Sequence, residues 1–84
     1  MSRSPLDKAR TRLKTFGEAR LLLLRDRRIG LTDIARALDV STATVSRVNK
    51  GTRRSRKIER EIARRLKLTE AEAFPEWHRR DVQP

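Results

Sequence analysis

The chain has 84 residues, of which 36% are hydrophobic and 39% are charged, so it can form one small domain with a limited core and a heavily solvated surface. It contains no cysteine, which excludes disulfide bonds and thiolate metal sites. The longest apolar run, Leu21 to Leu24, is too short to cross a membrane or to serve as a secretion signal, and we therefore expect a cytoplasmic protein.

The basic residues are distributed unevenly. Lys and Arg total 22 against 11 Asp and Glu, a formal net charge of +11. Residues 1–29 carry nine basic and three acidic groups and residues 53–68 carry eight and two, whereas residues 69–84 carry two and four. Charge runs are often only solvated faces, but the two basic blocks flank the segment 30–52. A polyanion is the expected partner, because each cation placed on a phosphate releases condensed counterions.

Residues 1–15 are expected to form a basic, helical N-terminal arm. Ser4 to Asp7 combines an N-cap serine, a proline at the first helical position and a carboxylate at the third. Thr15 to Glu18 offers a second capping box, and Gly17 either bends one continuous helix or separates two. Two apolar faces are predicted here: Leu6, Ala9, Leu13 and Phe16, followed by Ala19, Leu22 and Leu23.

The stretch Leu31 to Gly51 has the pattern of two short helices that cross at a tight turn, a helix-turn-helix. The first helix is predicted at about 31–38, capped by Gly30 or Thr32, and the second at about 42–49, capped by Ser41 and ended by Gly51. Asp39 stands where glycine is usual, and it tolerates a left-handed backbone better than most residues. The residues expected to pack between the two helices are Ile34, Ala35, Leu38, Val40, Val45 and Val48.

The remaining segment predicts one further helix and a short turn. Ser55 opens the helix, whose apolar positions are Ile58, Ile62, Ala63 and Leu66. Thr69 and Glu72 form a capping box for a turn that Pro75 is expected to stop, while Phe74 and Trp77 close the bottom of the core. The fold class predicted is all-α, with five helical segments, a domain over residues 16–78 and a C-terminal tail over 79–84.

Two runs of the motif resemble a known family. Leu-Thr-Asp-Ile-Ala from Leu31 and Val-Ser-Thr-Ala-Thr-Val-Ser-Arg-Val from Val40 are similar to the DNA-reading headpiece of lac-repressor-type regulators. The helices predicted before and after the motif follow instead the plan of the lambda-repressor-like (Cro/Xre-type) domain. Within that superfamily, residues 58–77 resemble the ending of Ner-type regulators of Mu-like phages. The resemblance covers about residues 18–78 and implies a bundle of four to five helices.

The same resemblance implies a repressor of a phage or mobile-element operon that acts in a bacterium or a phage-infected host. It places Thr42, Ala43, Ser46 and Arg47 at base edges in the major groove, and the planar Arg47 fork suits two acceptors of one guanine. The phosphate contacts expected from position and charge are Ser41, Thr44, Lys50, Arg53, Arg54, Arg56 and Arg36.

The expected partners are double-stranded DNA and a second copy of the chain. One reading helix contacts too few base pairs to find a site in a genome, and four consecutive leucines spread over roughly 300° of a helix cannot all face one core. Two alternatives stay open: an antitoxin that uses Leu21 to Leu24 to bind a protein partner, and a basic amphipathic helix over residues 1–29 on an anionic membrane. No enzyme, cofactor, metal or small-molecule ligand is expected, since His78 is the sole histidine and no catalytic motif occurs.

Overall fold

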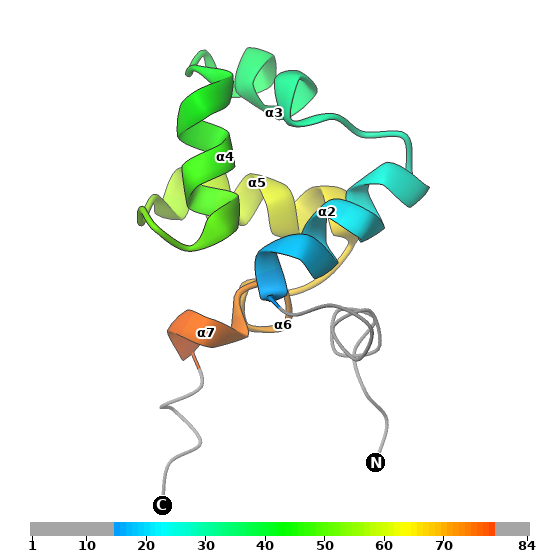
Figure 1. Cartoon of the computed structure of the whole chain (residues 1–84), viewed down its shortest axis with the longest axis vertical. Helices are drawn as coiled ribbons and strands as arrows, with labels where there is room; N and C mark the ends of the chain where they lie inside the picture. The colour runs from blue at the N-terminus through cyan, green and yellow to red at the C-terminus, as the bar shows by residue number, and fades with distance from the viewer. Residues whose placement is uncertain (1–14, 79–84) are drawn as a thin grey trace, which may run out of the picture.

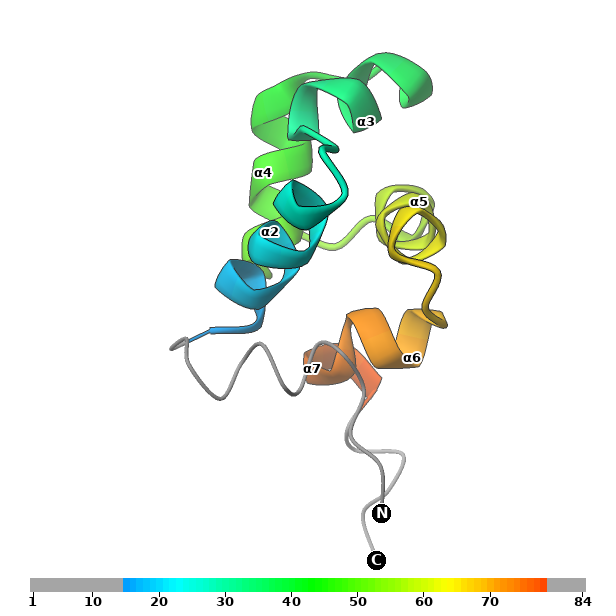
Figure 2. The same ribbon diagram turned by 90° about the vertical axis from the view of Figure 1, so that its right-hand side faces the viewer.

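Residues 15–78 are described by the computed structural model, and they form helices without any strand. Four helices are long: α2 (Phe16–Asp26), α3 (Leu31–Leu38), α4 (Thr42–Lys50) and α5 (Arg56–Leu66). Two short helices follow, α6 (Glu70–Ala73) and α7 (Pro75–His78). Helices α3 and α4 lie at one end of the molecule, α6 and α7 lie at the other, and α2 and α5 run between them (Figures 1 and 2). The helix predicted to start at Ser4 lies outside the described residues.

The helix starts follow the predicted caps. The Thr15 hydroxyl accepts a hydrogen bond from the Glu18 N–H at 3.1 Å, while the Glu18 carboxylate accepts from the Thr15 N–H at 3.2 Å. The hydroxyls of Ser41, Ser55 and Thr69 likewise accept from the N–H three residues on, at the starts of α4, α5 and α6. Of these three, Thr69 alone completes the box, since its own N–H donates to the Glu72 carboxylate. Gly30, not Thr32, is the N-cap of α3, and its N–H donates to the Asp33 carboxylate at 2.9 Å. These side chains satisfy backbone groups that a helix start would otherwise leave unpaired.

All four long helices end in a Schellman motif, in which the N–H groups of a left-handed residue and of the residue after it donate to carbonyls of the last turn. Gly51 closes α4 with φ of 83°, as glycine is suited to do. The corresponding residues of α2, α3 and α5 are Arg28, Asp39 and Lys67, with φ of 59°, 56° and 58°. The left-handed turn predicted at Asp39 is therefore confirmed, and two further left-handed residues carry long cationic side chains.

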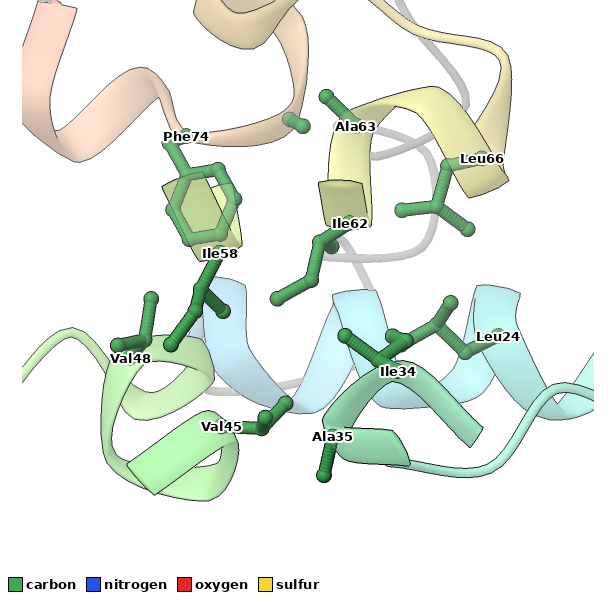
Figure 3. Close-up of a cluster of buried hydrophobic side chains, with 11 residues drawn as sticks. Leu24, Ile34, Ala35, Val45, Val48, Ile58, Ile62, Ala63, Leu66 and Phe74 are labelled. Carbon is green, nitrogen blue, oxygen red and sulfur yellow. The ribbon is translucent and has the colours of Figure 1, made fainter. Parts of the chain in front are cut away.

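The core lies where α2, α3, α4 and α5 meet, and Phe74 closes it on the side of α6 and α7 (Figure 3). Its buried side chains are Leu24, Ile34, Ala35, Val45, Val48, Ile58, Ile62, Ala63, Leu66, Ala73 and Phe74. Every apolar position predicted from the α5 periodicity is in this set, while Leu38, Val40 and Trp77 pack against it and are partly buried. Each helix thus contributes one apolar face, and these faces together make up most of the core.

The prediction for the apolar face of α2 was wrong. Leu22 was assigned to the apolar face of its helix but is 39% exposed, whereas Leu24 is 1% exposed and belongs to the core. Leu24 instead points into the cluster that it forms with side chains of α3, α4 and α5. The short turn capped by Thr69 ends before Pro75, as predicted, but Pro75 also begins a further helix, α7, because a proline fits the first position of a helix. No helix among residues 15–78 is long and apolar enough to span a bilayer.

Candidate nucleic-acid interface

Helix α4 divides its side chains between the core and one open face. Val45 and Val48 are fully buried against α3 and α5, which fixes the rotation of the helix about its axis. The four residues predicted to reach base edges follow the opposite stripe: Thr42, Ala43 and Arg47 are exposed, and Ser46 is half-buried. The structure therefore brings these four together on one helix face. An exposed α-helix of this kind has the width that the major groove of B-DNA admits.

The open face continues into a run without acidic residues. Residues 41–58 contain six Lys and Arg and no Asp or Glu. Lys50 lies one turn beyond Ser46 and Arg47, and Arg53 follows the turn at Gly51; both are exposed. Within the described chain, the side chains of Arg47, Lys50 and Arg53 have neither an ion pair nor a hydrogen bond, and they are free to meet an anion. We call the set Thr42, Ala43, Ser46, Arg47, Lys50 and Arg53 the α4 surface.

Ser41 and Thr44, two of the predicted phosphate contacts, stand at the start of α4. The Ser41 hydroxyl oxygen accepts from the Thr44 N–H at 3.1 Å and lies 2.7 Å from the Thr44 hydroxyl. Both hydroxyls are thus used within the helix cap, although Ser41 is also exposed. Arg36, on α3, is exposed and unpaired in the described structure.

Arg54 and Arg56 have intramolecular partners, unlike Arg53. The Arg54 Nε lies 3.0 Å from Oε2 of Glu59, a side chain that is only 2% exposed, and its guanidinium stands 4.4 Å from the Trp77 ring centroid. Arg56 forms a long ion pair of 4.0 Å with Glu70 and stays largely exposed. Arg54 therefore links the loop after α4 to α5 and α7, and its neutralisation of Glu59 is an intramolecular role that the sequence did not indicate.

Arg20 was not among the residues predicted to have a role, and it is fully buried beneath α4. Its guanidinium donates to the Asn49 side-chain oxygen at 3.2 Å, to the Ala73 carbonyl at 2.8 Å and to the Glu76 carboxylate at 3.0 and 2.7 Å, and it also bonds the Asn49 carbonyl. The group stacks 4.0 Å from the Phe74 ring centroid. One arginine thereby joins α2 to the end of α4 and to the α6–α7 region.

A close backbone approach completes this junction. A Cβ added at Gly17 would stand 3.0 Å from the Asn49 carbonyl oxygen and 3.2 Å from the Lys50 Cα, so α2 and α4 touch where a glycine is required. The Asn49 amide donates to the Gly17 carbonyl at 3.1 Å. Gly17 thus neither bends a long helix nor separates two within the described chain; it lies in the first turn of α2 and lets α4 dock.

The sequence spacing indicates that Arg20 is buried, since Phe16, Arg20 and Leu24 recur every fourth residue and therefore share one stripe of α2.

Away from α4, one acidic group on α5 is held by two arginines. Glu61 bonds Arg64 at 2.6 Å and Arg65 at 2.7 Å. The Arg64 hydrogen bond keeps the pKa of the Glu61 carboxyl below its ordinary value, although burial opposes the shift, and the same bond raises the pKa of Arg64. These two cations are therefore partly neutralised.

No group of His, Asp or Glu among residues 15–78 is placed to hold a metal ion. Comparison of the chain with protein-family models, curated proteins and solved structures gave no match. A function for the chain is therefore inferred from its own residues.

Proposed function

We propose that the chain is a sequence-specific, double-stranded DNA-binding regulator of transcription, and a repressor by its resemblance to phage regulators. In this proposal α3 and α4 form a helix-turn-helix of the lambda-repressor-like type, and α4 enters the major groove. Arg47 would read a base pair through its two-pronged donor set, with Thr42, Ala43 and Ser46 close to the base edges. Lys50 and Arg53 would contact flanking phosphates.

The observation that carries this proposal is that no acidic side chain neutralises the cations of the α4 surface. Its three cations are exposed and unpaired, and residues 41–58 contain no carboxylate that could neutralise them. The buried valines on the other side of α4 hold the helix at a fixed rotation, as readout of base edges requires. An antitoxin would need an apolar surface for its protein partner, and the exposed part of the leucine run is Leu22 with the half-buried Leu21.

We further propose that two copies act together on DNA. A single α4 would cover only a few base pairs, whereas a two-fold pair reads two half-sites about 34 Å apart. Leu22 is the single large hydrophobic side chain exposed among the described residues, which favours association on DNA over a stable dimer in solution. Sedimentation with and without the selected duplex would measure this difference.

Selection of binding sites from a pool of random duplexes tests the proposed function. The wild-type chain should enrich one short site, and Arg47→Ala should lose about 1–3 kcal/mol on that site and relax preference at one base pair. Arg25→Ala is the matched control, because Arg25 is an exposed, unpaired arginine on α2. Failure of the wild-type chain to enrich any site, or equal behaviour of the two variants, would refute sequence reading by α4.

A further inference from the structure

Unpaired cations occur in a second place, away from α4. Among residues 15–78, eight Lys and Arg side chains have neither an ion pair nor a hydrogen bond: Arg25, Arg27, Arg28, Arg36, Arg47, Lys50, Arg53 and Lys67. Three of them, Arg27, Arg28 and Lys67, follow the last turns of α2 and α5. We call these three residues the α2/α5 end surface.

The ends of α2 and α5 lie on the same side of the molecule. Both point to the right in Figure 1 and toward the viewer in Figure 2, whereas α4 lies at the left of Figure 1. Leu68, the residue after Lys67, packs with Leu23 against Ala19 of α2. Arg27 lies one helical turn beyond Leu23, on the same stripe. The three cations therefore follow helix ends that lie on the same side of the molecule, whereas α4 lies at the left of Figure 1.

Two of these cations occupy backbone positions that favour glycine. Arg28 has φ of 59° and Lys67 has φ of 58°, both in the left-handed region. A side chain there is strained relative to glycine, and a positive charge after a helix C-terminus recovers part of that cost from the helix dipole. Strained backbone positions cluster at functional sites, so a long cation where a glycine would fit is a candidate for a binding role.

The composition of this edge selects the partner. Asp26 is the one carboxylate beside Arg27 and Arg28, and Glu61 is already shared by two arginines, so the edge keeps an excess of positive charge. It has no exposed large hydrophobic residue, since Leu22 alone has that character in the described structure. A polyanion recognised through its backbone suits such a surface, whereas a protein interface core would require apolar anchors.

We propose that the α2/α5 end surface binds the phosphate backbone of a second DNA duplex, so that one molecule bridges two DNA segments. The inference rests on the proposed function, because the first duplex is the one held by the α4 surface. The ends of α2 and α5 lie at the right of Figure 1 and α4 lies at the left, so a duplex seated on the α4 surface leaves the α2/α5 end surface open to a second one. Bridging would hold distant sites together without any contact to bases of the second segment.

A capture experiment with the whole chain tests the proposal. One short duplex is immobilised, and a second, labelled duplex of the same sequence is added with the protein at low salt. The variant combines Arg28→Gly with Lys67→Gly, which removes two cations and also relieves the left-handed strain, so its Tm should equal or exceed that of the wild type. The charge-matched control combines Lys57→Gln with Arg60→Gln, two exposed cations of α5 that lie outside both surfaces.

The wild type and the control should capture the labelled duplex, while the double-glycine variant should capture at least about fivefold less. Its affinity for a single duplex should stay within about twofold of the wild type. Wild-type protein that binds one duplex but captures no second one would overturn the proposal. Full capture by the double-glycine variant would also overturn it, because bridging would then come from the α4 surfaces of two paired molecules. A loss of single-duplex affinity in that variant would also overturn it, because the cations would then serve the first duplex.

Failure of the proposed function itself would look different: Arg47→Ala combined with Arg53→Ala would leave single-duplex binding unchanged.

Discussion

The two faces of α4 use arginine in opposite ways. Beneath the helix, Arg20 is fully buried, and every part of its guanidinium meets an acceptor or the Phe74 ring. On the open face, Arg47 is exposed and has no partner in the described structure. The first arginine holds the end of α4 in place, and the second remains available to a ligand. A net charge of +11 therefore does not measure how many cations can bind DNA. Some of the Lys and Arg side chains are buried or paired with carboxylates and cannot reach a phosphate.

The largest expected effect lies at the buried arginine. Arg20→Met keeps a side chain of similar length but leaves Asn49, the Ala73 carbonyl and Glu76 without their donor. A buried acceptor left without its donor costs about 1–3 kcal/mol, and the substitution leaves the Asn49 and Ala73 acceptors in that state while Glu76 is partly exposed. We therefore expect the free energy of unfolding to fall by about 3 kcal/mol. Urea denaturation would measure it. Arg25→Met on the same helix is the control and should change stability by less than about 0.5 kcal/mol. Equal stability of the two variants would refute the junction that we assign to Arg20.

Neighbouring arginines in the loop after α4 sharpen the comparison. Arg54→Ala leaves the buried Glu59 carboxylate with only the Ser55 N–H as a donor, so the free energy of unfolding should fall by about 1–2 kcal/mol. Arg53→Ala should leave stability unchanged and weaken specific and nonspecific DNA alike. Thermal melts and duplex titrations of both variants would separate the roles. Stability losses of equal size would show that the two arginines do not differ as we describe.

A smaller effect is expected where α5 ends. Lys67→Gly replaces a strained left-handed residue and should raise the free energy of unfolding by about 0.5–1 kcal/mol, despite the greater freedom of glycine in the unfolded chain. Lys57→Gly places the same residue type inside α5 and should lower stability by about 1 kcal/mol. If both substitutions destabilise the chain alike, the left-handed backbone of Lys67 is not strained.

The smallest effect concerns Glu61. Its pKa is lowered in the folded chain, so the carboxylate contributes stability above its ordinary pKa of 4.5, and that contribution is lost as the pH falls through the folded value. Glu61→Gln should therefore reduce the free energy of unfolding at neutral pH by less than about 1 kcal/mol, since Arg64 is largely exposed. Denaturation of the two proteins at neutral and acidic pH should show the difference vanish in acid. A constant difference at all pH values would contradict the ion pairing.

Local signals in the sequence predicted much of the fold. The caps at Thr15, Ser41, Ser55 and Thr69 were predictable because a hydroxyl and its backbone partner are only three residues apart. The core of α3, α4 and α5 was predictable because one apolar stripe per helix must be buried. The exposure of Leu22 was not predictable, since four consecutive leucines leave the buried side of α2 undefined.

The candidate site was predicted less completely. The residues of α4 could be assigned to one face from helical periodicity alone. The roles of Arg20 and Arg54 depend on Glu76 and Trp77, whose positions follow from packing between distant segments, and on the burial of Glu59, which spacing along the chain does not give. A basic residue that lies on an otherwise apolar stripe, as Arg20 does between Phe16 and Leu24, is the pattern that would have revealed the buried cation.

The salt dependence of duplex affinity, for the wild type and for Arg47→Ala combined with Arg53→Ala, tests most directly whether the α4 surface meets DNA. The logarithm of the association constant should fall linearly with the logarithm of salt concentration, with a slope of about −4 to −8 for one or two subunits. The double variant should bind more weakly and with a shallower slope, because fewer counterions are released. A wild-type slope near zero, or an unchanged slope and affinity in the variant, would contradict the assignment of α4 as the DNA-binding helix.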